Sequence, residues 1–229
     1  MLFDGKKIEF VLLEKLKGVD TKGWIFFAAA AVLAAALIIF LVQRRKKCTE
    51  PAASTANPTP TVILVHGALC IAISFVLSYF KLFSMPNGGS ITLASMLPLM
   101  VYSNRYGAKY GVMAGVVYGF LQYIQKPEMT HWIQMLVDYP IAFGVIGLGG
   151  LVKGERNLVF SVLIGGTLRF LCHLFTGAVF FGEYAAAGQS AFMHSLLYNA
   201  PYMFADIAVC VIIAMLPPFR KAIRSALKY

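Results

Sequence analysis

Long apolar runs separated by short polar segments dominate this sequence. The first run, residues 23–43, contains no charged residue and is followed at once by the four basic residues 44–47. About 20 apolar residues are enough to cross the hydrocarbon core of a bilayer. This run also exceeds the apolar core of a signal peptide, which has roughly 7–15 residues. The pattern therefore predicts a retained transmembrane helix ahead of the rest of the chain.

Six further apolar runs predict a six-helix membrane domain within residues 61–229. The expected spans are residues 61–80, 90–103, 107–124, 132–152, 158–181 and 191–215. The second span is short for a membrane, so we expect it to lie partly inside the bundle. Residues 44–60 are polar and rich in Pro, Thr and Ala, which is typical of a linker. The predicted fold class is an all-α integral membrane protein with one extra N-terminal helix.

The first 22 residues mix charged positions with an apolar stripe. The stripe consists of Leu2, Phe3, Ile8, Val11, Leu12 and Leu16. An interfacial amphipathic helix has this pattern, and a poorly ordered tail fits it equally well. Both interpretations of residues 1–22 stay open at this point.

Composition supports a polytopic membrane protein. The 229 residues are 59% hydrophobic and only 13% charged, with a mean hydropathy of +0.73, beyond what a soluble domain needs. The net charge of +10 is expected to mark cytoplasmic loops rather than a nucleic-acid partner. Isolated cysteines and the lack of phosphate-loop, HExxH and GxSxG motifs predict no metal, no cofactor and no ATP hydrolysis by this chain.

Basic residues predict the orientation in the bilayer. If the linker is cytoplasmic, the cytoplasmic segments contain Arg44, Arg45, Lys46, Lys47, Arg105, Lys109, Lys153, Arg156, Arg220, Lys221, Arg224 and Lys228. The other side keeps Lys81, Lys126 and five lysines of the N-terminal tail. By the positive-inside rule, both ends of the six-helix domain are cytoplasmic and the tail is extracellular.

Asp138 lies inside an apolar run, residues 131–152, that is long enough to span the membrane. An ionised Asp in lipid costs about 2.5–3.5 kcal/mol even on the insertion scale, so it needs partners. Gln134 lies one helical turn earlier on the same face and can donate a hydrogen bond. Pro140 frees a nearby carbonyl, and Tyr139 lies beside them. The pattern predicts a polar site for a small cationic ligand, or alternatively a structural pairing with another helix.

Two more polar residues are expected at a similar depth. Counted from the outer helix ends at 1.5 Å per residue, Asp138 lies about 9 Å deep, and His173 and Asn199 about 12 Å deep. Three helices would then bring polar groups to one level, which favours a site over an isolated helix–helix contact. Arg169 and Asp206 lie deeper, and we expect them to form a structural ion pair.

Small residues recur every four positions on two of the predicted helices. Gly111, Gly115 and Gly119 on one helix, and Ala68 and Ala72 on another, each form such a series. Small residues let neighbouring helices approach closely. Packing inside the domain is the simplest interpretation of both series.

Five motifs occur in order between residues 61 and 220. They are MPNGGSITLASMLPL (85–99), NRYGAKYG (104–111), LVDYPIAFGVIGLGGL (136–151), HLFTGAVFFGEYA (173–185) and SLLYN (195–199). Together they resemble the thiamine-specific substrate-binding (S) components of energy-coupling-factor (ECF) transporters. The resemblance implies a six-helix S component in the bacterial plasma membrane that binds thiamine at its extracellular side. It also implies a membrane scaffold protein and two cytosolic ATPases as partners.

The resemblance also implies roles for particular residues. The family's acidic residue and its neighbouring tyrosine match Asp138 and Tyr139, and its helix-five histidine matches His173. With the residues around them, the expected ligand-binding set is Asp138, Tyr139, His173, Gly177, Phe181, His194, Asn199, Tyr118 and Gln134. The family's scaffold-docking pair of small residues matches Ala68 and Ala72.

This chain departs from the family pattern at four positions. Some members have Glu where Asp138 stands, and a ring-stacking tryptophan falls at Phe181, whose aromatic face is smaller. A pocket tyrosine falls at His194, whose imidazole side chain can carry a proton, and a loop tryptophan falls at Gly89. These differences bear on affinity and on the choice between thiamine and its phosphates or precursors.

Three functions remain to be separated. The first is a thiamine-binding subunit that depends on ATPase partners. The second is a self-sufficient proton-coupled carrier, with Asp138 or His194 as the proton site. The third is a membrane enzyme in which His173 and Asp138 act as base and acid.

Overall fold

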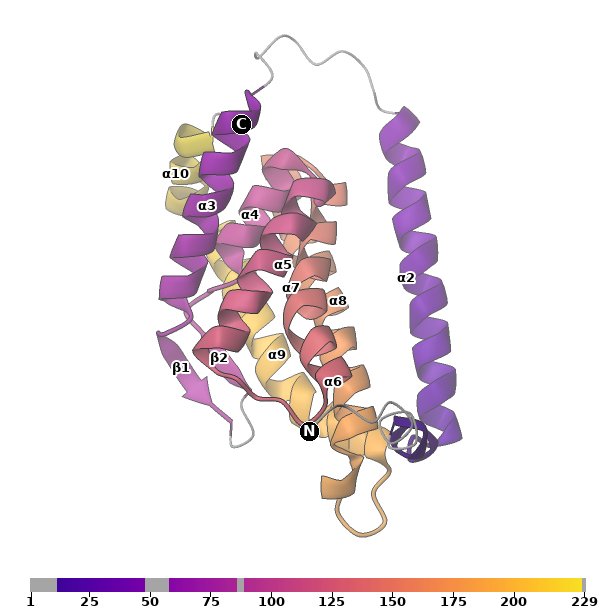
Figure 1. Cartoon of the computed structure of the whole chain (residues 1–229). Coiled ribbons are helices and arrows are strands. Elements are labelled where there is room, and N and C mark those ends of the chain that lie inside the picture. The colour runs from indigo at the N-terminus through magenta and orange to yellow at the C-terminus, as the bar shows by residue number, and fades with distance from the viewer. Residues whose placement is uncertain (1–11, 48–57, 86–88, 228–229) are drawn as a thin grey trace, which may run out of the picture.

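The computed structural model describes residues 12–47, 58–85 and 89–227. The long helices run alongside one another and form a bundle, with the first long helix at its edge (Figure 1). Most of the expected linker and the Leu2, Phe3, Ile8 and Val11 part of the apolar stripe lie outside the described residues.

The described elements follow one another in this order. After a short helical segment at residues 12–17 come α2 (Thr21–Lys47), α3 (Pro60–Leu77), β1 (Lys81–Ser84), β2 (Ser90–Thr92), α4 (Leu97–Tyr106), α5 (Ala108–Gln125), α6 (Trp132–Leu136), η1 (Val137–Ile141), α7 (Ala142–Ile146), η2 (Gly147–Leu151), η3 (Glu155–Asn157), α8 (Leu158–Phe180), η4 (Gly182–Tyr184), α9 (Ala191–Met215) and α10 (Pro217–Leu227). The final helix, α10, was not among the predicted elements.

Five stretches of the described chain are long and apolar enough to cross a membrane. They are Thr21–Gln43, Pro60–Leu77, Trp132–Leu151, Glu155–Phe180 and Ala191–Met215. The extra N-terminal helix and four of the six predicted spans are therefore confirmed. The protein is a multi-pass membrane protein.

The prediction of a helix from residue 90 to residue 103 is wrong in its first half. Residues 90–92 form β2, which pairs with β1 in an antiparallel hairpin with Ser84 opposite Ser90. The helix α4 begins only at Leu97 and has 10 residues, about 15 Å at the usual helical rise. Eight of these residues are buried, so the expectation that this segment lies inside the bundle is confirmed. An apolar run cannot distinguish a strand from a buried helix by hydrophobicity alone.

The segment that carries Asp138 is not one regular helix. It passes from α6 through the π-helical turn η1 to α7 and then to the 3₁₀ turn η2. Pro140 lies inside the π turn, where its ring nitrogen cannot donate the usual backbone hydrogen bond. Such π turns occur frequently at functional sites, and this one holds both Asp138 and Pro140 in buried positions.

Helix α5 packs tightly against this interrupted segment through its glycine series. A Cβ atom on Gly115 would lie 3.0 Å from the Cα of Gly144, and one on Gly119 would lie 2.7 Å from the Cα of Pro140. Real Cβ atoms rarely come this close, so only glycine allows the approach. The interpretation of this series as internal packing is confirmed.

Segments expected to be cytoplasmic meet at one end of the bundle, where α10 lies (Figure 1). Arg224 donates two hydrogen bonds to the Glu155 carboxylate, at 2.8 and 2.9 Å. Arg105 donates from Nε to the carbonyl of Leu227 at 3.0 Å. These contacts join the end of α4 and the turn η3 to α10, so three segments expected to be cytoplasmic lie close together in space.

Cysteine labelling would check the orientation. In a chain whose native cysteines are replaced by alanine, Ala187→Cys should react in intact cells with a membrane-impermeant thiol reagent. Lys221→Cys should react only after the cells are opened, because the positive-inside rule places α10 in the cytoplasm. Both positions are exposed. Reaction of Lys221→Cys from outside would reverse the predicted orientation.

Candidate functional site

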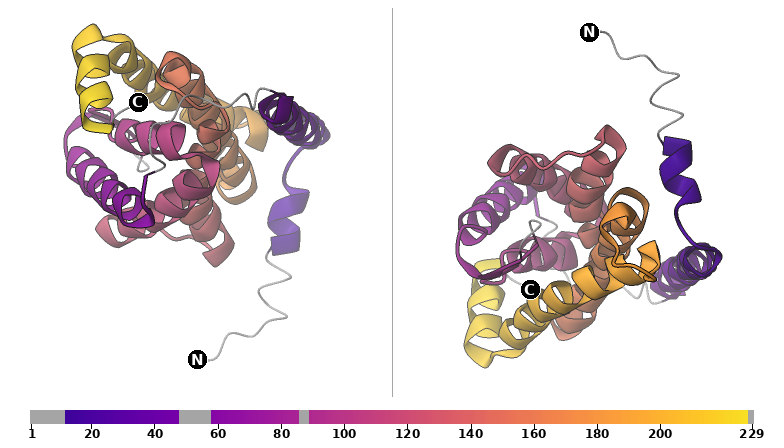
Figure 2. Two further views of the ribbon diagram at one scale, coloured as in Figure 1. Left: turned by 90° about the horizontal axis from the view of Figure 1, so that it is seen from above. Right: turned by 90° about the horizontal axis from the view of Figure 1, so that it is seen from below.

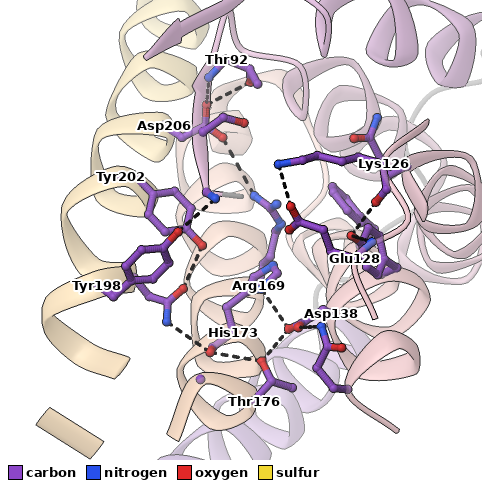
Figure 3. A pocket seen from close by; sticks show the side chains of 18 of the residues that line it. Thr92, Lys126, Glu128, Asp138, Arg169, His173, Thr176, Tyr198, Tyr202 and Asp206 are labelled. Atoms are coloured by element: carbon purple, nitrogen blue, oxygen red, sulfur yellow. Dashed lines mark hydrogen bonds and ion pairs between the residues drawn. The ribbon is translucent and has the colours of Figure 1, made fainter. Parts of the chain in front are cut away.

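One cavity of about 830 Å³ lies between the hairpin, α5, the interrupted segment, α8 and α9. Small-molecule sites are commonly clefts of roughly 300–1,000 Å³, so the volume suits a small organic ligand. Figure 3 shows polar side chains from several of these elements converging on the space.

All nine residues expected to bind a ligand line this cavity. They are Tyr118, Gln134, Asp138, Tyr139, His173, Gly177, Phe181, His194 and Asn199. They come from α5, α6, η1, α8 and α9, together with Phe181 just after α8. The structure thus brings together residues up to 81 positions apart, from Tyr118 to Asn199. Their role in binding remains a proposal.

Three side chains converge on the carboxylate of Asp138 (Figure 3). Gln134 Nε2 donates to Oδ2 at 2.6 Å, as the spacing of four residues predicted. Thr176 Oγ1 donates to Oδ1 at 2.5 Å. His173 Nδ1 lies 3.0 Å from Oδ1, and because an ionised carboxylate only accepts hydrogen bonds, this ring nitrogen carries the proton. The carboxylate is held in position but keeps room for a further partner.

The negative charge of Asp138 has no Lys or Arg partner among the residues that the structure describes. The guanidinium of Arg169, which also lines the cavity, lies 3.9 Å from Asp206 instead and sits 4.5 Å from the centre of the Phe143 ring. The expected Arg169–Asp206 ion pair is confirmed. Asp138 itself is only 9% exposed. Its hydrogen bonds come from Gln134 and Thr176, with the His173 ring beside it, so a buried carboxylate without a Lys or Arg partner favours a cation as a further neighbour.

His173 offers the cavity a second, unused polar atom. Its Nδ1 faces Asp138, whereas its Nε2 is buried and has no hydrogen-bond partner among the described residues. In the neutral tautomer with its proton on Nδ1, Nε2 is a hydrogen-bond acceptor. A ligand that donates a hydrogen bond here would satisfy the atom.

Asn199 is fixed on the opposite wall by hydrogen bonds to residues of α8 and α9. Its Nδ2 donates to the carbonyls of Ser195 at 3.0 Å and His173 at 3.3 Å, and its Oδ1 accepts from the Tyr202 hydroxyl at 2.8 Å. The contact with His173 confirms that Asp138, His173 and Asn199 meet at one level. Such a fully bonded amide is a rigid wall for a ligand.

Gly177 allows α8 and α9 to approach each other at this level. A Cβ atom there would collide with the hydroxyl of Ser195 and lie 2.9 Å from Nδ2 of Asn199. Gly89 plays a similar part in the hairpin, since a Cβ on it would lie 2.7 Å from the Tyr202 ring. The tryptophan that the family pattern has at this position would not fit without movement of that ring.

Aromatic rings form much of the remaining lining. They are Tyr79, Tyr118, Tyr139, Phe143, Phe181, Tyr184, Tyr198 and Tyr202. Phe181 and Tyr184 lie 6.3 Å apart at the cavity rim. The Tyr139 hydroxyl donates to the carbonyl of Lys126 at 2.8 Å, which fixes its ring against the loop before α6. Flat rings of this kind suit a planar, partly polar ligand.

The hairpin is tied to α9 across the cavity. The backbone N–H of Thr92 donates to Asp206 Oδ1 at 2.9 Å, and the Thr92 hydroxyl donates to the same atom at 3.0 Å. Gly89 N donates to the Tyr198 hydroxyl at 3.2 Å. Asp206 therefore serves both the ion pair and the hairpin, which supports its structural interpretation.

Thr176 and Tyr202 are the clearest omissions from the residues predicted by sequence. Each lies three positions after a predicted residue on the same helix, Thr176 after His173 and Tyr202 after Asn199. Residues three apart share a helix face, so this spacing was the available signal. Nothing in the sequence distinguishes them from other polar residues in the same spans until the helices are packed.

Ala68 and Ala72 lie on the outer surface of α3, and both are exposed. The interpretation of this pair as packing inside the domain is wrong. Gly67 faces inward in their place, and a Cβ on it would lie 2.8 Å from the Tyr102 hydroxyl. The small-residue face of α3 is thus exposed on the surface of the described part of the chain.

Comparison with known proteins gives one consistent result. The thiamine transporter protein family (Thia_YuaJ) matches residues 64–225. The thiamine transporter ThiT of Bacillus subtilis (strain 168) is 34% identical over 169 residues, 67% of this chain and 86% of its own length. The thiamine transporter ThiT of Lacticaseibacillus paracasei is 25% identical over 178 residues, 68% of this chain and 86% of its own length. A solved structure of ThiT from Listeria monocytogenes is similar with a TM-score of 0.62 at 25% identity, covering 73% of this chain and 96% of that one. The present chain belongs to the thiamine transporter protein family.

Proposed function

We propose that this chain captures thiamine at the extracellular side of the membrane and delivers it inward as the S component of an ECF-type importer. The observation that carries the proposal is the buried carboxylate of Asp138, which faces the cavity without a Lys or Arg partner among the described residues. Membership of a transporter family supports transport over the membrane-enzyme interpretation.

The chemistry of thiamine matches the charged, polar and aromatic groups that line the cavity. Its thiazolium ring carries a permanent positive charge, which Asp138 would compensate in a site with little water. Its aminopyrimidine ring is flat, and its amino group can donate to the free Nε2 of His173. Phe181 and Tyr139 offer aromatic faces for stacking. An analogue without one of these groups would leave a buried atom unpaired and bind more weakly.

The proposed delivery step uses energy from partner proteins. The chain contains no phosphate-loop motif, so ATP would be hydrolysed by two cytosolic ATPases, joined to this chain through a membrane scaffold protein. The exposed Ala68 and Ala72 lie one turn apart on α3. Small residues at this spacing permit close contact with another membrane helix, and we assign that face to the scaffold protein.

Reconstitution into liposomes tests the proposal. The purified chain should bind thiamine, measured by isothermal titration calorimetry, but should not accumulate radiolabelled thiamine in liposomes on its own. Accumulation should begin when the scaffold and ATPase proteins are reconstituted with the chain so that the ATPases face the liposome interior, and ATP is enclosed there. Uptake by the chain alone under a proton gradient would establish the proton-coupled carrier instead. Absence of thiamine binding would contradict both.

A further inference from the structure

The N-terminal part of the chain lies outside the family match, which begins at residue 64, yet it contacts the rim of the cavity. Helix α2 lies beside α8 at the edge of the bundle, and the short segment before α2 lies at the same edge, near the end of α8 (Figure 2). Trp24 and Phe27 of α2 contact the ring of Phe175 at 6.4 and 5.4 Å. Phe175 lies between His173 and Gly177 along α8.

The segment before α2 packs its apolar residues against the end of α8. Val19 is 5% exposed and belongs to a cluster with Ala178, Val179 and Phe180. Leu12, Leu16 and Phe181 pack against the same cluster. In the described part of the tail, the apolar stripe therefore covers protein, and Phe181 of the cavity rim belongs to the same packing unit.

Lys15 forms the polar interactions between the N-terminal segment and the end of α8. Its Nζ donates to the carbonyl of Phe180 at 3.3 Å and lies 3.7 Å from the Glu183 carboxylate. The last carbonyls of a helix lack partners within that helix, and a cation nearby also interacts favourably with the helix dipole. Lys15 thus caps the C-terminus of α8 from a distant part of the sequence, at the residue directly before Phe181.

Phe180, at the end of α8, also contacts the start of the segment that carries Asp138. His131 stacks on Phe180 with ring centres 5.3 Å apart and accepts the Ile133 N–H at Nδ1 at 3.2 Å. Burial and, secondarily, the Lys15 charge lower the pKa of His131 below its usual value, which suits a ring nitrogen that must accept. Lys15, Phe180 and His131 therefore link the N-terminal segment to two of the elements that form the site.

We propose that residues 12–27 brace the cavity rim and that Lys15 is a positioning residue, which holds the turn at residues 180–184 so that Phe181 and Tyr184 stay over the bound ligand. The proposal rests on the proposed thiamine site. Phe181 and Tyr184 both line the cavity. A rim held in place raises the barrier to ligand escape, so the effect of Lys15 falls mainly on the dissociation rate.

Dissociation kinetics of the full-length chain test this role. Lys15→Met keeps the aliphatic stem but removes the charge and the hydrogen-bond donor. Release of radiolabelled thiamine into excess unlabelled thiamine should be about three- to tenfold faster, because a charged hydrogen bond at a half-buried position is lost. The association rate should change less than about twofold, since the site itself is intact.

Two matched variants separate positioning from general stability. Lys17→Met removes an exposed charge from the same segment and should release thiamine at the wild-type rate. Lys15→Arg keeps a donor and a charge and should restore slow release. Unchanged release from Lys15→Met would overturn the proposal, as would a lower number of binding-competent molecules with a normal release rate. If the wild-type chain binds no thiamine, the proposed function fails first.

Discussion

Asp138→Asn is expected to weaken thiamine binding by about 30- to 1,000-fold, which corresponds to roughly 2–4 kcal/mol for a charge-assisted contact in a buried site. The substitution keeps the size of the side chain and an acceptor oxygen but removes the charge. Because Asp138 has no Lys or Arg partner among the described residues, no cation is left unpaired when the charge disappears. The loss should therefore appear in ligand binding.

Calorimetry of thiamine binding and thermal melting of the ligand-free protein measure the two possible effects. We expect the melting temperature to stay within about 4 °C of the wild type, the shift that roughly 1–2 kcal/mol produces in a protein of this size. Asp138→Glu should be much milder, since members of the family carry that residue. Glu14→Gln removes a charge from an exposed position that does not line the cavity and should change affinity less than about threefold. Normal binding with early melting in Asp138→Asn would show that Asp138 has a structural role only.

Ala68→Trp is expected to abolish thiamine uptake in cells while leaving the affinity of the isolated chain within about twofold of the wild type. Ala68 is exposed on α3, so a larger side chain meets no neighbour inside the domain. A partner helix that approaches across the small-residue face would be displaced by the indole ring. Uptake and co-purification of the scaffold protein should fall together.

A second exposed alanine supplies the matched control. Ala208→Trp introduces the same ring at an exposed position of α9 and should leave both uptake and assembly intact. If Ala68→Trp reduces thiamine binding as strongly as uptake, the face of Ala68 and Ala72 has no special docking role. Loss of uptake in both variants would show a general sensitivity to bulky residues at the lipid surface.

Much of the membrane architecture could be predicted because the bilayer imposes a length and a composition on each span. Residues 23–43 and the spans that became α3, α8 and α9 satisfy that requirement on their own. The span at residues 90–103 does not, because it is shielded by the bundle and divides into a strand and a short helix. Its structure depends on the neighbours that cover it.

The candidate site was predictable where its contacts are local. Gln134 and Asp138 are four residues apart, so helical geometry alone brings them together, and the distance of 2.6 Å agrees. The similar depth of Asp138, His173 and Asn199 in the membrane could be predicted by counting residues from the end of each helix, because the rise per residue of an α-helix is known. Thr176 could not be assigned in this way, because its hydroxyl reaches Asp138 only through the packing of α8 against η1.

The sequence by itself determined most of the segments that are long and apolar enough to cross the membrane, and which of them carry polar groups, because contact with lipid favours apolar side chains and makes each polar one stand out. Only the tertiary structure decided how those groups are shared: Asp206 with Arg169 and the hairpin, Asp138 with neutral donors, and Lys15 with the end of α8. It also decided that Gly67 faces inward and Ala68 outward. Which polar side chains pair, and which face of a helix points into the bundle, both depend on the relative rotation of the helices. That rotation is set by contacts between residues far apart in the chain.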